Sequence, residues 1–81
     1  MHVTIRLFAR LRELTGTSEL SRTVPDGSSA GDAWKLLAAE FPAIADYGRS
    51  ISCAVNEEYS RMSTPLRDGD EVAFLPPVSG G

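Results

Sequence analysis

The chain has 81 residues, a formal net charge of −3 and one cysteine, which together predict a single domain with a hydrophobic core and no disulfide framework, as in a reducing compartment. Its arginines lie singly and form no basic stripe, which argues against nucleic acid as a partner. No stretch has the length and apolar character of a membrane span or an export signal, so we expect a cytoplasmic protein with no membrane partner.

The N-terminal third contains two strand patterns separated by helix formers. Residues 2–9 alternate between an apolar face of Val3, Ile5 and Leu7 and an opposite face of His2, Thr4, Arg6 and Phe8, which predicts a half-buried strand. Residues 10–16 end in Thr-Gly and predict a short helical turn or loop. A second strand is expected around residues 18–24.

One amphipathic helix is expected over residues 30–40. Ser29 and Asp32 have the spacing of a capping box, and Pro42 is expected to end the helix. An apolar stripe at three-and-four spacing places Trp34 in the core or at its edge; its members are Ala30, Ala33, Trp34, Leu37 and Phe41.

The C-terminal third predicts a turn-like stretch to residue 50, a strand over 51–56, a turn at Glu57-Glu58, short pairing strands and a last strand over 71–75. Val72 and Phe74 should point inward from this strand. The order β, β, α, β, β, with one helix able to cover one sheet face, favours a two-layer α+β fold. We therefore expect a domain over residues 1–75 and a tail over 76–81.

The composition of the tail would suit its insertion into a narrow channel of another protein. Two prolines hold the exit extended and cannot continue a strand ladder, and the final glycines have no side chains to hinder entry into a channel. A terminal Gly-Gly by itself is more often an ordinary disordered end. The tail residues are Pro76, Pro77, Val78, Ser79, Gly80 and Gly81.

Three stretches resemble the small subunits of molybdopterin synthase, which are ubiquitin-like sulfur carriers: LFARLREL, AVNEEYS and DGDEVAFLPPVSGG. The resemblance covers nearly the whole chain and implies a β-grasp fold with a mixed sheet. It also implies that an E1-like adenylyltransferase uses ATP and Mg²⁺ to adenylate the Gly81 carboxylate, and that a persulfide donor then converts it to a thiocarboxylate. Nothing in it implies a permanently bound cofactor.

In the family, the carrier inserts this tail into the large synthase subunit, which holds the catalytic groups. Sulfur then passes from the tail to cyclic pyranopterin monophosphate. The resemblance thus implies that this chain is a non-catalytic subunit of a heterotetramer. Positions matching Phe8, Arg12, Tyr59 and Leu75 lie near the large subunit. Alternation places Phe8 and Leu75 on outward phases, consistent with a docking patch, although each could also complete the edge of the core. Leu75 replaces a commoner aromatic residue.

The remaining reactive side chains predict no site of their own. His2 is expected at a solvated strand edge, Cys53 as a buried inert thiol, and the acidic residues at 68, 70 and 71 as a solvated turn without metal. Three alternatives stay open: a carrier for thiamine synthesis or tRNA thiolation, a protein modifier forming isopeptide bonds, and a noncovalent binding module. As a modifier, the chain could extend itself only through Lys35, its single lysine, or its N-terminus.

Overall fold

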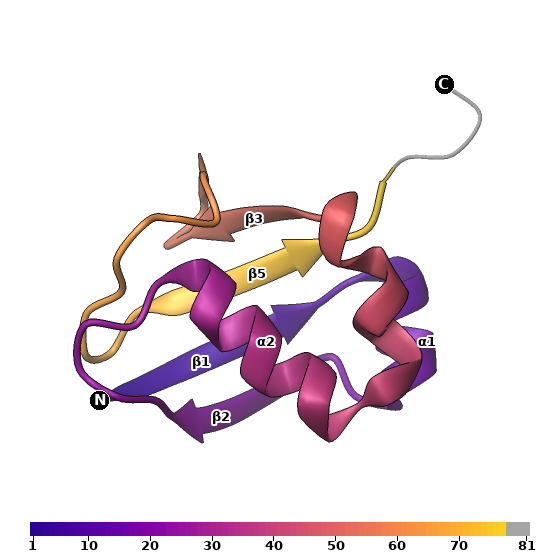
Figure 1. Cartoon of the computed structure of the whole chain (residues 1–81), viewed down its shortest axis with the longest axis horizontal. Coiled ribbons are helices and arrows are strands. Elements are labelled where there is room, and N and C mark those ends of the chain that lie inside the picture. Colours follow the sequence, from indigo (N-terminus) through magenta and orange to yellow (C-terminus); the bar gives the residue numbers. More distant parts are fainter. Residues whose placement is uncertain (78–81) are drawn as a thin grey trace.

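The computed structural model describes residues 1–77, whose centre is a five-stranded mixed sheet with the strand order β2-β1-β5-β3-β4 (Figure 1). The strands are β1 (His2–Leu7), β2 (Glu19–Thr23), β3 (Ser52–Val55), β4 (Glu58–Ser60) and β5 (Glu71–Leu75). β1 and β5 pair in parallel, and every other neighbouring pair is antiparallel. The first and last strands of the chain therefore lie side by side in the middle of the sheet.

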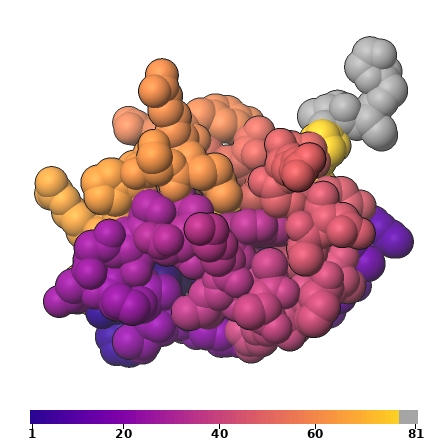
Figure 2. Space-filling model, in the orientation of Figure 1, coloured from indigo at the N-terminus to yellow at the C-terminus, as the bar shows by residue number. Residues whose placement is uncertain are grey.

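The helices are α1 (Ala9–Thr15), α2 (Ala30–Glu40) and the 3-10 helix η1 (Pro42–Arg49). In Figure 1, α2 crosses one face of the sheet, whereas α1 lies at the end where β1 and β5 finish. The space-filling view shows α2 in magenta and η1 in red as one continuous surface over that face (Figure 2). This two-layer α+β arrangement is the predicted β-grasp fold.

The core lies between the sheet and the helical layer, where the predicted alternation is confirmed. Trp34 is almost fully buried and meets Phe74 edge-on, with 5.1 Å between the ring centroids. Phe41, the last member of the predicted stripe, is only half-buried. The largest fully buried side chains are Phe74, Ile5, Leu7, Leu11, Leu37, Ile44, Val3, Val72 and Cys53.

The N-terminus of α2 is fixed by its own side chains and by a distant loop. The predicted capping box is present: the Asp32 backbone N–H donates to Ser29 Oγ at 3.2 Å, and the Ser29 N–H donates to Asp32 Oδ2 at 2.9 Å. In addition, the Gly31 N–H donates to the carbonyl oxygen of Met62 at 2.7 Å. The loop between β4 and β5 is thereby held against the start of the helix.

Two boundaries in the N-terminal half differ from the prediction. β1 ends at Leu7 and not at residue 9, because Ala9 adopts a φ of 50° and turns the chain into α1. The helical turn predicted over residues 10–16 is a complete α-helix, which Gly16 closes with a φ of 75°.

Two further segments differ in the C-terminal half. The stretch predicted as turn-like is the helix η1: Pro42 follows the end of α2 but also starts this helix, and Ile44 is fully buried in the core. The turn between β3 and β4 lies at Asn56-Glu57, with φ values of 51° and 70°, so Glu58 already belongs to β4. β4 is one of the short pairing strands expected in this region, whereas η1 is a helix that was not predicted.

Candidate functional site

The chain leaves the sheet at the end of its central strand, β5, and we call this position the exit. Because β5 runs parallel to β1, the C-terminal end of β5 lies at the end of the sheet where β1 stops and α1 begins (Figure 1). Pro76 is half-buried and Pro77 exposed directly after β5, and the last described residues emerge in yellow at the margin of Figure 2. Residues 78–81 lie outside the described residues, so the predicted roles of Val78, Ser79, Gly80 and Gly81 remain predictions.

The sheet face opposite α2, which we call the open face, carries the side chains that point away from the core. A row of paired residues crosses it in the order Glu19, Arg6, Ala73, Ala54 and Tyr59. Neighbouring strands are about 4.8 Å apart, so Arg6 and Tyr59 stand roughly 14 Å apart with two alanines between them. On the open face, two small apolar side chains thus separate the larger side chains of Arg6 and Tyr59.

The exit end of the open face carries two large apolar side chains. Leu7 and Phe74 form the last pair of the β1–β5 ladder and point inward, so Phe8 and Leu75, one residue further along each strand, take the outward phase. Phe8 keeps an extended backbone, with φ −124° and ψ 155°, and is 37% exposed. An apolar surface therefore adjoins the point where the tail leaves.

A charged cluster occupies the centre of the open face. Arg6 Nη1 lies 3.7 Å from Glu71 Oε1, and Arg6 Nε lies 4.0 Å from Glu19 Oε1. The guanidinium carbon also stands 5.4 Å from the centroid of the Phe8 ring. We call Arg6, Glu19 and Glu71 the Arg6 cluster. Alternation alone placed Arg6 on the polar face of its strand, but its carboxylate partners come from two other strands and carry no local sequence signal.

Comparison with known proteins identifies the family. The ThiS family model matches residues 5–81. The chain belongs to the ThiS family. This match spans the open face, the helical layer and the tail, and therefore includes every residue of the predicted contact set.

Curated relatives of this ThiS-family chain include the molybdopterin synthase sulfur carrier subunit of Arabidopsis thaliana, 37% identical over 81 residues that cover 100% of this chain and 84% of the relative. The small archaeal modifier protein 3 of Haloferax volcanii is 32% identical over 94 residues, covering 100% of both chains. The crystal structure of SAMP1 from Haloferax volcanii has a TM-score of 0.87 at 30% identity, again over 100% of both chains. The predicted resemblance and fold are confirmed.

The four predicted contact residues of the ThiS-family chain do not form one compact patch. Phe8 and Leu75 lie together at the exit end of the open face. Tyr59 shares that face but sits on the edge strand β4, where it is 80% exposed. Arg12 lies exposed on α1, beyond the end of the sheet. A partner that touched all four would have to cover the open face and reach around the exit.

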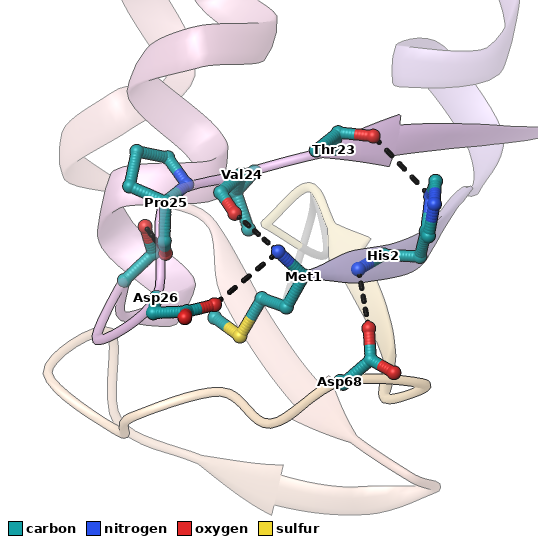
Figure 3. Close-up of polar contacts among 8 residues, drawn as sticks. Met1, His2, Thr23, Val24, Pro25, Asp26 and Asp68 are labelled. Carbon is teal, nitrogen blue, oxygen red and sulfur yellow. Dashed lines mark hydrogen bonds and ion pairs between the residues drawn. The ribbon is translucent and has the colours of Figure 1, made fainter.

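The end of the sheet where β1 begins holds the single histidine, His2, and the acidic turn at residues 68–71 (Figure 3). His2 Nδ1 lies 3.2 Å from Thr23 Oγ1, and the His2 backbone N–H donates to Asp68 Oδ1 at 2.7 Å. Asp70 accepts from the Asn56 amide at 3.0 Å and from the Arg67 N–H at 2.8 Å, and these hydrogen bonds lower the pKa of its carboxyl. The acidic turn is therefore hydrogen-bonded into the fold, not merely solvated as predicted.

Cys53 lies on the inner face of β3, as predicted. It is 1% exposed, and its Sγ donates to the Ser60 carbonyl oxygen at 3.2 Å. Burial raises the pKa of this thiol, which disfavours the reactive thiolate. Within residues 1–77, no three His, Cys, Asp or Glu side chains gather closely enough to hold a metal ion, and no helix is long and apolar enough to cross a bilayer.

Proposed function

We propose that this chain is the sulfur carrier subunit of a molybdopterin synthase, with the Gly81 carboxylate as its working group. The observation that carries the proposal is the position of the exit: the tail leaves from the central strand β5 beside the apolar pair Phe8 and Leu75. The name of the Arabidopsis thaliana relative supports the same pathway. A docked partner would thus receive the tail directly from the surface it contacts.

The chemistry begins with activation, because a carboxylate is a poor electrophile. An E1-like adenylyltransferase with ATP and Mg²⁺ would form the Gly81 acyl-adenylate and release pyrophosphate. A persulfide sulfur then attacks the acyl carbon and expels AMP, and a second thiol reduces the resulting acyl disulfide to the thiocarboxylate. The thiocarboxylate sulfur is the nucleophile that a large synthase subunit would direct at cyclic pyranopterin monophosphate.

The division of labour between subunits agrees with the described residues. Cys53 is buried on the inner face of the sheet, and His2 lies at the start of β1, whereas β5 ends beside the end of β1. Phe8 and Leu75 instead offer a surface to a partner. We therefore assign the chain the role of carrier and docking module and assign the catalytic groups to the large subunit.

The test is the intact mass of the chain after incubation with its host's activating enzyme, ATP, Mg²⁺ and a persulfide donor. Exchange of oxygen for sulfur should add about 16 Da to the full chain. A chain lacking Gly81 is the control and should not gain mass. If an active enzyme neither adenylates the full chain nor changes its mass, the carrier function is wrong and a noncovalent binding module takes its place.

A second candidate, protein modification, is favoured by the similarity to small archaeal modifier proteins. It shares the adenylation step but ends with attack by a lysine amine on the activated carbonyl. Lys35, the single lysine, is exposed on α2 and offers the one lysine side chain for a self-linked product. Such a product would appear as a covalent dimer that persists under reducing denaturation and disappears in the Lys35→Arg variant, unless it is linked through the N-terminus.

A further inference from the structure

The Arg6 cluster lies on the open face but outside the predicted contact set. Its three charges come from three adjacent strands: Glu19 from β2, Arg6 from β1 and Glu71 from β5. The side chains of Arg6, Glu19 and Glu71 are 42%, 62% and 34% exposed. The cluster is therefore wet in the free chain and would lose water if a partner covered this face.

The ion pairs of the cluster are long in the free chain. Separations of 3.7 and 4.0 Å are too wide for hydrogen bonds, and exposed pairs of this kind contribute little in water. Covering the face lowers the local dielectric and strengthens both attractions. Because Arg6 brings its own carboxylates, docking does not leave its charge buried and unpaired, which is the costly case.

Arg6 also contacts the Phe8 ring. Its guanidinium carbon is 5.4 Å from the ring centroid, within the range of a cation–π interaction. The two carboxylates flank the guanidinium from the side of β2 and from the side of β5, and their attraction for it grows when a partner covers this face. The cation–π interaction is also stronger when water is removed, and the ring lies at the exit end, where the tail leaves.

We propose that Arg6 is a positioning residue for docking: it holds the Phe8 ring in the orientation that the large synthase subunit contacts. This inference rests on the proposed function. The partner's matching surface is apolar where it meets Phe8, and the orientation of the ring sets how well it fits. Glu19 and Glu71 act through Arg6 by keeping its guanidinium over the ring.

The experiment is a double-mutant cycle on the dissociation constant for the host's large subunit, measured by calorimetry with the full chain. Arg6→Met keeps an unbranched chain but removes the charge, and Phe8→Leu keeps apolar bulk but removes the ring. We expect Arg6→Met to weaken binding roughly fivefold in the wild-type background and to have little effect in the Phe8→Leu background. Arg6→Lys, which restores a cation, should recover at least half of the loss.

Arg22→Met is the matched control, because Arg22 is an ion-paired arginine on the opposite side of the sheet, where it contacts Glu40. It should bind the large subunit like the wild type. Thermal unfolding of each variant separates folding from docking; if Arg6→Met unfolds early, Arg6→Gln repeats the cycle with a planar neutral group.

Three results would overturn the inference. If the wild-type chain does not bind the large subunit, the proposed function fails and takes the inference with it. If the wild type binds and Arg6→Met binds equally well, docking stands but Arg6 does not position it. If Arg6→Met weakens binding equally with and without the Phe8 ring, Arg6 contacts the partner directly and not through Phe8.

Discussion

Replacing Gly31 with alanine would test the contact that holds the β4–β5 loop against α2. A Cβ on Gly31 would lie 3.1 Å from the carbonyl oxygen of Met62, which already accepts a 2.7 Å hydrogen bond from the Gly31 N–H. Backbone hydrogen bonds of 2.9 and 2.8 Å also fix the loop at Thr64 and Leu66. The loop cannot retreat from the new methyl group without lengthening these bonds.

The expected sign follows from two opposing magnitudes. Alanine improves helix propensity over glycine by at most about 1 kcal/mol. Crowding at the pinned carbonyl and the weakened hydrogen bond cost about 2 kcal/mol. The net loss of about 1 kcal/mol should lower the unfolding temperature of a domain of this size by about 4–8 °C.

Thermal unfolding followed by circular dichroism measures this difference directly. Ala39→Gly, at an exposed position of the same helix, is the control that reports helix propensity without a loop contact. It should lower the unfolding free energy by about 1 kcal/mol. A Gly31→Ala chain that unfolds at a higher temperature than the wild type would show that the loop yields, and the reasoning from the Met62 contact would be wrong.

Three further predictions concern pH, the thiol and the open face. Hydrogen bonds from Ser29 lower the pKa of Asp32, and hydrogen bonds from Asn56 and Arg67 lower the pKa of Asp70. This stabilisation is present above the unfolded carboxyl pKa and is lost as pH falls through the lower folded values. The urea concentration at the unfolding midpoint should therefore fall as the pH is lowered below about 4, and it should fall less in Asp70→Asn. Cys53 should react with a thiol reagent only after denaturation, and equal rates in both states would contradict its burial. Tyr59→Ser should weaken docking about tenfold without changing the unfolding temperature; unchanged affinity would remove Tyr59 from the contact.

The elements that could be predicted well have signals contained within a few residues. The bounds of α2 follow from the Ser29–Asp32 capping box and those of β5 from alternation after a turn, and both match the structure. The predicted end of β1 was wrong because Ala9 has a positive φ, which an alanine in the sequence does not indicate. The helix η1 was missed because it is held by the burial of Ile44, which depends on the rest of the fold.

The candidate site divides in the same way. The outward phases of Phe8 and Leu75 could be predicted because alternation is local and the structure keeps it. The Arg6 cluster could not be predicted, since Glu19 and Glu71 become its neighbours only through the pairing of three strands. The hydrogen bonds of Asp70 depend in the same way on where the β3–β4 turn places Asn56. Long-range pairing therefore supplies the charged centre of the open face, and alternation supplies its apolar end.

The central position of β5 has a mechanical consequence. A tail that enters a partner and is later withdrawn transmits force to the last strand of the fold. β5 is bonded to β1 on one side and β3 on the other, and a pull along its length loads both ladders in shear, so their hydrogen bonds must break together. A carrier whose last strand lay at an edge would hold by one ladder alone. Under the proposed function, a pull on the tail would be resisted by two ladders, and the strand that anchors the tail would stay in the sheet.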